Sequence, residues 1–413
     1  MKTINQDKVW KISKYLENKY YNFNRDEILE ILSKNFIDEA YSKISKWPSY
    51  EATPLVSLNK LSKELNLNNV FYKDESKRFG LKSFKALGGA YAVEKVSNGK
   101  KNITIATATA GNHGRSVAWG SQRLGLKCKI FISEFVSEYR ANEMKKLGAD
   151  VIRVNGNYEA SLNECLDQSK KNGWHIVQDV AWQDYELVPK LTMAGYSVMI
   201  KEISTQTDQY ITHVFLQAGV GGMAAGSVAG IANYFKKIPK IIIVEPESAD
   251  CVLQSIENGS IKKVDIKKES IMGGMSCGEV SLVPWKILKN SVDLCLSIGD
   301  DQIAKTIAML ANSKFADEKI IIPSQARKPK SVDPNARWRR LSKKLMEEYG
   351  FIAEREHYPF TNCFWVAMPE NAEDLAEDLD DYLSHETHVC DGWDQVYFRM
   401  QEMKQFMDKH FPN

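Results

Sequence analysis

Lys85 is the residue of this sequence that raises the sharpest chemical question, because it lies between Phe84 and Ala86 in the stretch "SFKALGG". Ser83 can cap a helix by accepting hydrogen bonds from its first free N–H groups, which would place Lys85 in the first turn. The positive end of the helix and the apolar neighbours both disfavour an ammonium group, so we predict a lowered pKa for this amine. Such an amine can attack an aldehyde. The alternative is a lysine whose stem covers apolar surface while its head reaches water.

A second candidate is the turn "AGNHG", which covers residues 110–114 and follows an apolar run. A strand that passes through a glycine turn into a helix presents several backbone N–H groups to an anion such as a carboxylate. Asn112 adds a side-chain amide that can donate to an oxygen atom. The same pattern is also typical of an ordinary turn, so it indicates an anion site only in combination with other features.

A third candidate is the glycine-rich stretch "QAGVGGMAAG", residues 217–226, which again follows an apolar run. Glycines at 219, 221 and 222 allow the backbone to close around a small anion, with the start of a helix behind it. The stretch has neither the spacing of a dinucleotide-binding fingerprint nor the Lys-Ser/Thr of a P-loop. We therefore interpret it as a cup for a single phosphate group.

The three candidates have a common explanation that none of them has alone. A lysine suited to forming a Schiff base, an asparagine-bearing loop and a cup for one phosphate are the parts needed to hold pyridoxal phosphate. The sequence therefore predicts this cofactor and no metal ion. The group His385, His388, Cys390 and Asp391 has no spacing typical of a metal site, and we expect a capped helix end there.

The elements that must position these loops alternate along the chain from about residue 60 to 300. Short runs rich in Val and Ile, separated by amphipathic helical patterns, predict βαβ units and parallel sheets, hence an α/β fold. The expected strands cover residues 69–74, 103–108, 128–133, 150–155, 175–180, 212–218 and 240–246. We expect residues 1–50 to be helical, with Trp10 and Trp47 as packing anchors.

The pattern changes after about residue 322, and we expect residues 326–413 to form a small separate α+β module. A basic run there, residues 327–344, could meet phosphate backbones, but acidic residues 370–381 follow it and a solvated helix face is the better interpretation. The net charge of +2 over 413 residues argues against a charge-driven nucleic-acid or membrane binder. The seven dispersed cysteines indicate reduced thiols, and with no apolar N-terminal run we expect a cytoplasmic protein.

Several stretches in order, from about residue 45 to 315, carry a family resemblance: "YEATPLVSLNKLSKELNLNNVFYKDESKRFGLKSFKALGGAYA", "TATAGNHGRSVAW", "VQDVAWQDYELVPKLTMAGY", "LQAGVGGMAAG", "VEPESADC" and "IMGGMSCGE". The chain resembles diaminopropionate ammonia-lyase, a fold type II pyridoxal-phosphate enzyme related to threonine dehydratase and tryptophan synthase β. The resemblance implies two three-layer subdomains built on parallel sheets, the smaller (about 85–200) inserted in the larger, together spanning residues 1–325. It also implies a homodimer.

The resemblance assigns roles to individual residues. Lys85 is then the Schiff-base lysine, and Asn112 contacts the ring hydroxyl of the cofactor. Asp179 matches a family acid and is the candidate base, with Lys85 as its rival; by itself Asp179 could equally be a cap or an ion-pair partner. The remaining residues implied are the phosphate contacts Gly219, Val220, Gly221, Gly222 and Met223, the substrate-carboxylate contacts Ala110, Gly111 and His113, and the nearby loop residues Ser276, Cys277 and Glu279.

The resemblance also implies the reaction, which is the splitting of 2,3-diaminopropionate, a small amino acid, into pyruvate and ammonia. Ala110 stands where the family has an acid that serves one face of the substrate, so we expect preference for the L enantiomer. Two alternatives stay open. One is a catalytically impaired scaffold that acts as a binding protein, and the other is a serine or threonine ammonia-lyase.

Overall fold

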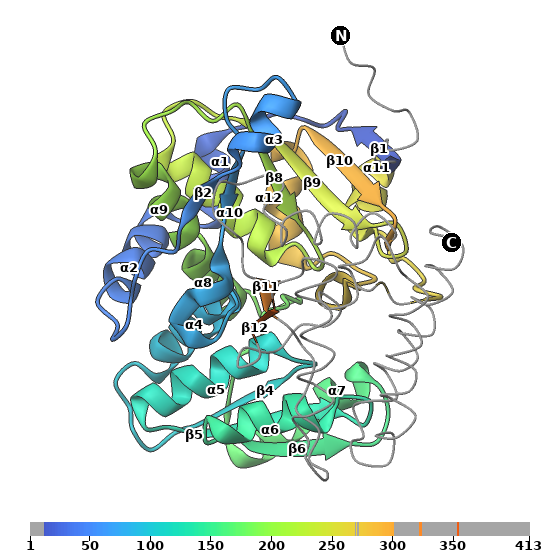
Figure 1. The fold of residues 1–413 in the computed structure, drawn as a ribbon. Helices are drawn as coiled ribbons and strands as arrows, with labels where there is room; N and C mark the ends of the chain where they lie inside the picture. Colours follow the sequence, from blue (N-terminus) through green and yellow to red (C-terminus); the bar gives the residue numbers. More distant parts are fainter. Residues whose placement is uncertain (1–11, 269, 271, 301–321, 324–352, 355–413) are drawn as a thin grey trace.

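The computed structural model describes residues 12–268, 270, 272–300, 322–323 and 353–354, which form two open sheets with helices packed around them. Figure 1 shows the larger sheet in the upper half of the molecule and the smaller sheet in the lower half. The two parallel sheets confirm the predicted α/β fold. The predicted C-terminal module, residues 326–413, lies outside the described residues except for one short strand.

The larger sheet has the strand order β1-β10-β9-β8. Its strands β8, β9 and β10 run parallel, and β1 pairs with β10 in the antiparallel direction. The apolar run of β9 is buried because helices cover both faces of the sheet, as parallel sheets require. The bounds are β1 Ile12–Glu17, β8 His213–Gln217, β9 Lys240–Pro246 and β10 Leu294–Ile298.

The smaller sheet has the order β6-β5-β4-β7, and all of its strands are parallel. Helices α5 and α7 pack against β4 and β5. In such sheets, ligands bind outside the carboxyl ends of the strands. Strand β4 ends at the 109–111 turn and β7 ends just before Asp179. Both candidates therefore lie at the carboxyl ends of the strands of the smaller sheet. The bounds are β4 Thr104–Ala108, β5 Lys127–Ser133, β6 Asp150–Val154 and β7 His175–Ile176.

Helices α4 and α8 lie between the two sheets, where α8 packs closely on both α4 and α10, and α5 packs on α4. Glycines make this approach possible. A Cβ atom added at Gly88 of α4 would lie 2.4 Å from Tyr196 Cε1, and one added at Gly89 would lie 2.4 Å from Ser116 Oγ. The two glycines that follow Lys85 therefore let α8 and α5 contact the lysine-bearing helix. The bounds of these four helices are α4 Lys85–Ser97, α5 Asn112–Leu124, α8 Leu187–Tyr196 and α10 Gly222–Tyr234.

Among the other helices, α6 and α7 pack on the smaller sheet and α11 on the larger one, whereas α1, α2, α9 and α12 pack mainly on other helices. Two short 3-10 helices, η2 Glu75–Gly80 and η3 Gly273–Met275, lie in loops that precede or face the candidate site. The remaining bounds are α1 Arg25–Ile31, α2 Lys34–Ile44, α3 Asn59–Glu64, α6 Glu138–Lys146, α7 Tyr158–Asn172, α9 Val198–Gln206, α11 Cys251–Asn258 and α12 Leu282–Ser291.

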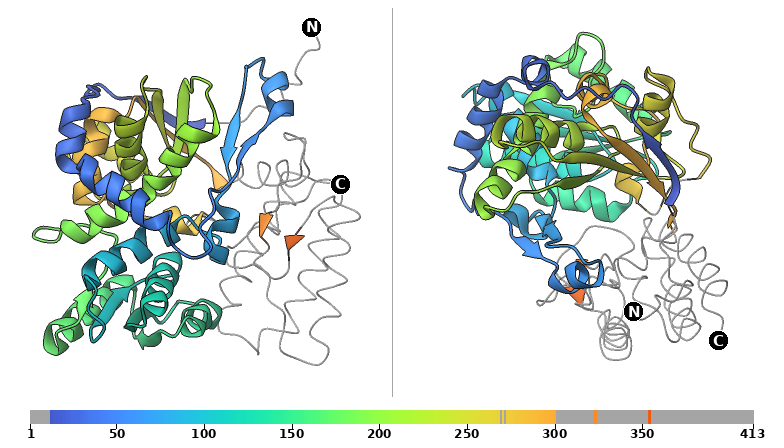
Figure 2. Two further views of the ribbon diagram at one scale, coloured as in Figure 1. Left: turned by 90° about the vertical axis from the view of Figure 1, so that its left-hand side faces the viewer. Right: turned by 90° about the horizontal axis from the view of Figure 1, so that it is seen from above.

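A hairpin of two short strands, β2 Leu55–Ser57 and β3 Phe71–Lys73, carries α3 between them. Both views of Figure 2 show this hairpin projecting from the body of the molecule. A further short pair, β11 Ile322–Pro323 with β12 Ala353–Glu354, is parallel. Within the described part of the chain, no helix is long and apolar enough to cross a membrane.

Three sequence expectations need correction. The segment 12–17 is a strand rather than a helix, because its alternating exposed and half-buried residues pair along the edge of the larger sheet. The expected strand 175–180 ends at Ile176, and beyond it Gln178 bonds the end of β4 through its side chain instead of its backbone. The strand β10 was not among the expected strands. Trp47 is a packing anchor as expected, with its ring 5.8 Å from that of Trp119.

Candidate active site

Lys85 is the first residue of α4, so it lies in the first turn, as its neighbours predict. The Ser83 hydroxyl accepts a hydrogen bond from the Lys85 N–H at 3.2 Å, but the N-cap residue of α4 is Phe84 rather than the predicted Ser83. The Ser116 hydroxyl of α5 donates to the Lys85 carbonyl at 2.6 Å and accepts from Ala90 N–H at 3.0 Å, which fixes α4 against α5. The Lys85 side chain is then directed to Asp179, with 2.6 Å between Nζ and Oδ2.

Asp179 is positioned by its neighbour Gln178, whose side chain is buried against the end of β4. The Gln178 amide oxygen accepts from the Thr107 hydroxyl at 2.8 Å and from Ala108 N–H at 3.1 Å. Its amide nitrogen donates to the Ala108 carbonyl at 2.9 Å and to the Tyr158 hydroxyl oxygen at 2.6 Å. Gln178 thus extends the ladder between β4 and β7 by its side chain and places Asp179 just beyond the sheet edge.

The Lys85–Asp179 pair overturns the predicted lowering of the Lys85 pKa. Burial lowers the pKa of Lys85, but the Asp179 carboxylate and its hydrogen bond outweigh burial, and the net shift is upward. Burial in turn raises the pKa of Asp179, while His113 and Lys85 lower it by more, so this carboxyl is ionised. Without a bound ligand the site therefore holds an ammonium and a carboxylate in contact.

His113 lies on the other side of Asp179, in the first turn of α5. Its Nε2 donates to the Val177 carbonyl at 2.9 Å, and its Nδ1 is 3.6 Å from Asp179 Oδ2. Burial lowers the pKa of His113, the nearby Lys85 ammonium lowers it further, and Asp179 opposes both. A neutral ring that donates from Nε2 has a lone pair at Nδ1, directed into the site.

The turn before α5 offers fewer free donors than the sequence predicts. The Thr109 hydroxyl accepts hydrogen bonds from the N–H groups of Gly111, at 3.0 Å, and of Gly114, at 3.2 Å. Gly111 therefore does not offer a free N–H to a substrate carboxylate, whereas no residue in the described part of the chain accepts from the N–H groups of Asn112 and His113. The candidate anion site at this helix end therefore has fewer free donors than predicted, namely the N–H groups of Asn112 and His113.

The predicted phosphate cup, residues 219–223, forms the connection between β8 and α10. Gly221, with φ of +89°, precedes the helix, and no described residue accepts a hydrogen bond from the N–H of Gly222 or Met223. A Cβ atom added at Gly219 would lie 3.0 Å from Cys277 Sγ and 3.3 Å from the Gly274 carbonyl. Side chains at these glycines would therefore crowd the cup.

The cup and the Asp179 loop are tied together by Ser281. Its N–H donates to the Val220 carbonyl at 2.9 Å, and its hydroxyl accepts from Ala181 N–H at 2.7 Å. Two of the loop residues that the family resemblance implies lie in different surroundings. Cys277 faces the cup, whereas Glu279 is exposed. The two halves of the site are thus held by one serine that the sequence interpretation did not identify.

The residues present fit pyridoxal phosphate. Three buried polar atoms surround the Lys85–Asp179 pair, and within the described residues none has a hydrogen-bond partner: Asn112 Oδ1, His113 Nδ1 and the Tyr196 hydroxyl. Buried polar groups are rarely left in this state unless a ligand completes them. Together with the free N–H groups of Gly222 and Met223, these atoms fit the polar groups of an aromatic aldehyde phosphate.

Sequence reasoning missed two further residues of the site, Tyr158 and Tyr196. Tyr158 follows the N-cap Asn157 and receives the hydrogen bond of Gln178, and Tyr196 ends α8 with its ring centroid 5.6 Å from Lys85 Nζ. Burial raises the pKa of both hydroxyls, so both are protonated. Tyr158 and Tyr196 both lie in helical patterns that are typical of core packing. The stretch that contains Gln178 ends at Tyr196, and it was the only sequence signal for this part of the site.

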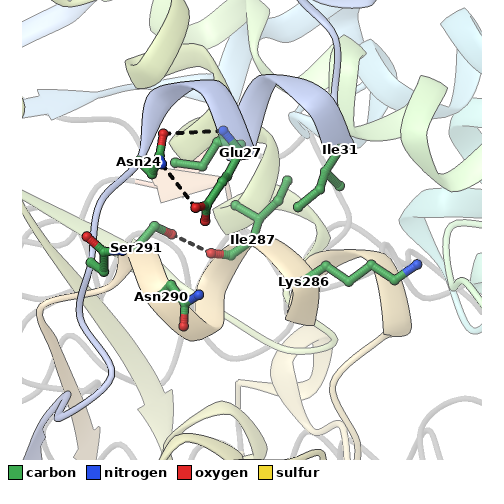
Figure 3. Close-up of a pocket in the computed structure, with 9 residues that line it drawn as sticks. Asn24, Glu27, Ile31, Lys286, Ile287, Asn290 and Ser291 are labelled. Carbon is green, nitrogen blue, oxygen red and sulfur yellow. Dashed lines mark hydrogen bonds between the residues drawn. The ribbon is translucent and has the colours of Figure 1, made fainter.

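A separate small cavity of about 30 Å³ lies between α1 and α12. Figure 3 shows Asn24 bonded to the backbone and side chain of Glu27, and Ser291 bonded to Ile287. This volume holds about one water molecule, and its polar lining atoms serve the helix ends, so it is not a substrate site. No group of three or more metal-ligating side chains occurs among the described residues; His385 to Asp391 lie outside them.

Comparisons with known proteins agree with this geometry. The family model for pyridoxal-phosphate dependent enzymes matches residues 46–321. Diaminopropionate ammonia-lyase of Escherichia coli strain K12 is 33% identical over 327 residues, which cover 74% of this chain and 81% of that protein. A crystal structure of the Escherichia coli enzyme in complex with D-serine superposes with a TM-score of 0.70 at 30% identity, covering 84% of this chain and 93% of the other.

A more distant relative is the biosynthetic L-threonine dehydratase of Staphylococcus epidermidis, 29% identical over 286 residues, which cover 67% of this chain and 64% of that protein. The chain belongs to the family of pyridoxal-phosphate dependent enzymes, with the fold type II architecture. It is a pyridoxal-phosphate-dependent enzyme related to the ammonia-lyases.

Proposed function

We propose that this chain catalyses the α,β-elimination of 2,3-diaminopropionate to pyruvate and ammonia. One water is consumed and two ammonia molecules are released per substrate, so that the atoms balance. The observation that carries the proposal is the contact of 2.6 Å between Lys85 Nζ and Asp179 Oδ2, surrounded by buried polar atoms that a ligand would complete. The similarity to diaminopropionate ammonia-lyase supports the choice of substrate.

Pyridoxal phosphate, when bound, supplies an aldehyde that joins an amine covalently and a ring that takes up electrons from the substrate Cα. Lys85 is the amine that holds it, Asn112 faces the ring, and residues 219–223 hold its phosphate. The substrate carboxylate binds at the N–H groups of Asn112 and His113, beside Ala110.

Asp179 acts as the base in this proposal. While Lys85 is an ammonium, the carboxylate is neutralised by it; once the amine is covalently bound, Asp179 is left ionised with His113 as its nearest polar neighbour. A carboxylate so placed can accept the proton of the substrate Cα, and Lys85, when displaced by the substrate amine, is the alternative acceptor. The buried hydroxyls of Tyr158 and Tyr196 are protonated and available as hydrogen-bond donors.

The substrate's stereochemistry follows from Ala110, which places a methyl group where the family acid would serve the opposite face. We propose that the L enantiomer is the preferred substrate. The test measures pyruvate release by the purified full chain with added pyridoxal phosphate, for the L and D forms separately. Equal turnover of the two forms would contradict this preference.

The elimination itself is tested with Lys85→Ala and Asp179→Asn. Lys85→Ala should lose the visible absorbance of the lysine-bound cofactor and all pyruvate release, whereas Asp179→Asn should keep the absorbance and lose ~100-fold or more in turnover. Lys77→Ala, at an exposed position of the same segment, is the matched control. A wild-type protein that binds the cofactor but releases no pyruvate from diaminopropionate would contradict the proposal.

A second candidate function is a serine or threonine ammonia-lyase, which the similarity to L-threonine dehydratase favours. The same assay with L-serine and L-threonine separates the two, because a β-hydroxyl and a β-ammonium make different demands on the leaving-group side of the site. Faster keto-acid release from L-threonine than from diaminopropionate would select the second candidate.

We further propose that the protein is cytoplasmic and forms a homodimer. Light scattering of the purified protein tests the homodimer.

A further inference from the structure

Tyr196 occupies the space between the lysine-bearing helix and the phosphate cup. A Cβ atom added at Gly88, three residues after Lys85 on α4, would lie 2.4 Å from its Cε1 atom. One added at Gly222, the first residue of α10, would lie 4.0 Å from its Cε2 atom on the other edge of the ring. The ring therefore spans the space between α4 and the start of α10, and its centroid lies 5.6 Å from Lys85 Nζ.

The ring is held there rigidly. Tyr196 is 1% exposed, and its ring packs edge-on against Phe84 with 5.2 Å between centroids. A Cβ atom added at Gly226, one turn further along α10, would lie 3.2 Å from Tyr196 Cβ. Glycines on both facing helices thus make room for this side chain, and its hydroxyl has little freedom to find another partner.

The Tyr196 hydroxyl has no hydrogen-bond partner among the described residues. It lies near Lys85, with 5.6 Å between the ring centroid and Nζ; burial raises the pKa of the hydroxyl, and Lys85 opposes this rise. A buried hydroxyl without a partner is unfavourable, which favours a ligand atom as its partner. The free N–H groups of Gly222 and Met223 belong to the first residues of α10, which the ring approaches. An anion bound there would accept hydrogen bonds from the hydroxyl and from both N–H groups.

We propose that the Tyr196 hydroxyl donates a hydrogen bond to the phosphate group of pyridoxal phosphate and positions it over the start of α10. This inference rests on the proposed role of residues 219–223 as the phosphate cup and of Lys85 as the cofactor lysine. It adds a side-chain donor from α8 to a cup otherwise made of backbone.

The test compares binding of pyridoxal phosphate with binding of pyridoxal, which has the aldehyde but not the phosphate. The cofactor-free full-length protein is titrated with each compound, and the visible absorbance of the lysine-bound form gives the dissociation constant. Tyr196→Phe should weaken pyridoxal phosphate binding by about 3- to 10-fold, the range expected for one hydrogen bond, and leave pyridoxal binding unchanged.

Tyr91→Phe is the matched control. Tyr91 is likewise fully buried on α4 with a hydroxyl that lacks a partner within the described chain, but it lies about 9 Å along the helix from Lys85 and on a different face. Removing its hydroxyl makes the same chemical change and should alter neither dissociation constant. Thermal unfolding of both cofactor-free variants shows that they remain folded.

The outcomes are distinct. Equal weakening of pyridoxal and pyridoxal phosphate binding would place the hydroxyl at the lysine end and overturn the proposal, as would wild-type affinity for both compounds in Tyr196→Phe. If the wild-type protein shows no lysine-bound absorbance with either compound, or if Lys85→Ala retains it, the proposed role of Lys85 fails instead. Substrate turnover does not enter any of these measurements.

Discussion

At Lys85 the local sequence and a distant residue act in opposite directions on the same amine. The helix start and the apolar neighbours lower its pKa, but Asp179, 94 positions further along the chain, raises it by more. The local part could be predicted because Ser83 and Phe84 are neighbours in the sequence. The distant part could not, because it depends on how β7 places Asp179 at the edge of the sheet.

Ala110→Asp is the prediction that belongs to the residue scale. A carboxylate at this position restores the family acid beside Arg140, whose guanidinium already donates to the Ala110 carbonyl at 3.0 Å. We expect the ratio of kcat/KM for D- over L-2,3-diaminopropionate to rise by ~10-fold or more, since a positioned base contributes ~10²–10⁴-fold.

Ala110→Asn is the control for that change, because it adds a side chain of the same size without a charge. If the Asp and Asn variants show the same ratio between enantiomers, the effect of position 110 is steric and the interpretation of Ala110 as a lost base is wrong.

At the scale of elements, the segment before Lys85 is anchored by a buried cluster that we call the Arg78 cluster: Arg78, Glu75, Glu202, Lys73 and Thr53. Arg78 is 1% exposed and bonds Glu75 at 2.7 and 2.8 Å and Glu202 of α9 at 2.7 and 2.8 Å. Lys73 also donates to Glu202, at 2.7 Å. Phe79 and Lys82, between this cluster and α4, have positive φ values, so the chain here is strained and needs such support.

Glu202→Gln should therefore lower the free energy of unfolding by about 3 kcal/mol, because it leaves buried cations with one carboxylate fewer. Urea denaturation of the cofactor-free protein measures the change. Thr205→Ala, an exposed substitution on the same helix, should change it by less than about 0.5 kcal/mol.

Adding Arg78→Met to Glu202→Gln should recover part of the loss, because an apolar side chain has no charge to compensate. If the double variant loses more free energy of unfolding than the two single variants lose together, the cluster stabilises the protein in another way.

The expected strands differ in burial: β9 is almost entirely buried, whereas β6 and β8 contain exposed residues and were predicted as well. The run Ile241–Ile243 is buried, and the predicted bounds of its strand, 240–246, are the observed bounds of β9. The edge strand β1 has polar residues and only half-buried neighbours, so its pattern does not separate it from a helix. In the site, glycine loops and Lys85 were found from their composition, whereas Tyr196 was not, because a buried tyrosine in a helix is typical of a core.

At the scale of the whole molecule, the burial of Glu245 makes the stability of the protein depend on pH. Glu245 is fully buried at the end of β9, and its oxygens accept hydrogen bonds from Val252 and Leu253 N–H at 2.8 Å each. Burial raises the pKa of Glu245 from 4.5 to about 8, and the two hydrogen bonds oppose this only in part. Between these two values the folded protein binds a proton at Glu245 that the unfolded chain does not.

The free energy of unfolding should therefore decrease through Glu245 as pH rises from about 5 to about 8, and then level off. Glu245→Gln should flatten this dependence, which thermal unfolding at a series of pH values measures. Glu247→Gln, at an exposed position two residues further on, should keep the slope of the wild-type protein. An equal slope in the Glu245 variant and the wild type would refute the assignment.

The antiparallel pairing of β1 with β10 has a consequence for synthesis of the chain. Leu16 pairs with Cys295, so β1 leaves the ribosome 279 residues before the strand with which it pairs. The smaller sheet, by contrast, is complete once residue 176 has been made. During translation the smaller sheet can assemble early, while β1 stays unpaired until β10 emerges. The charges of Lys14 and Glu17 on this strand then oppose its pairing with other nascent chains.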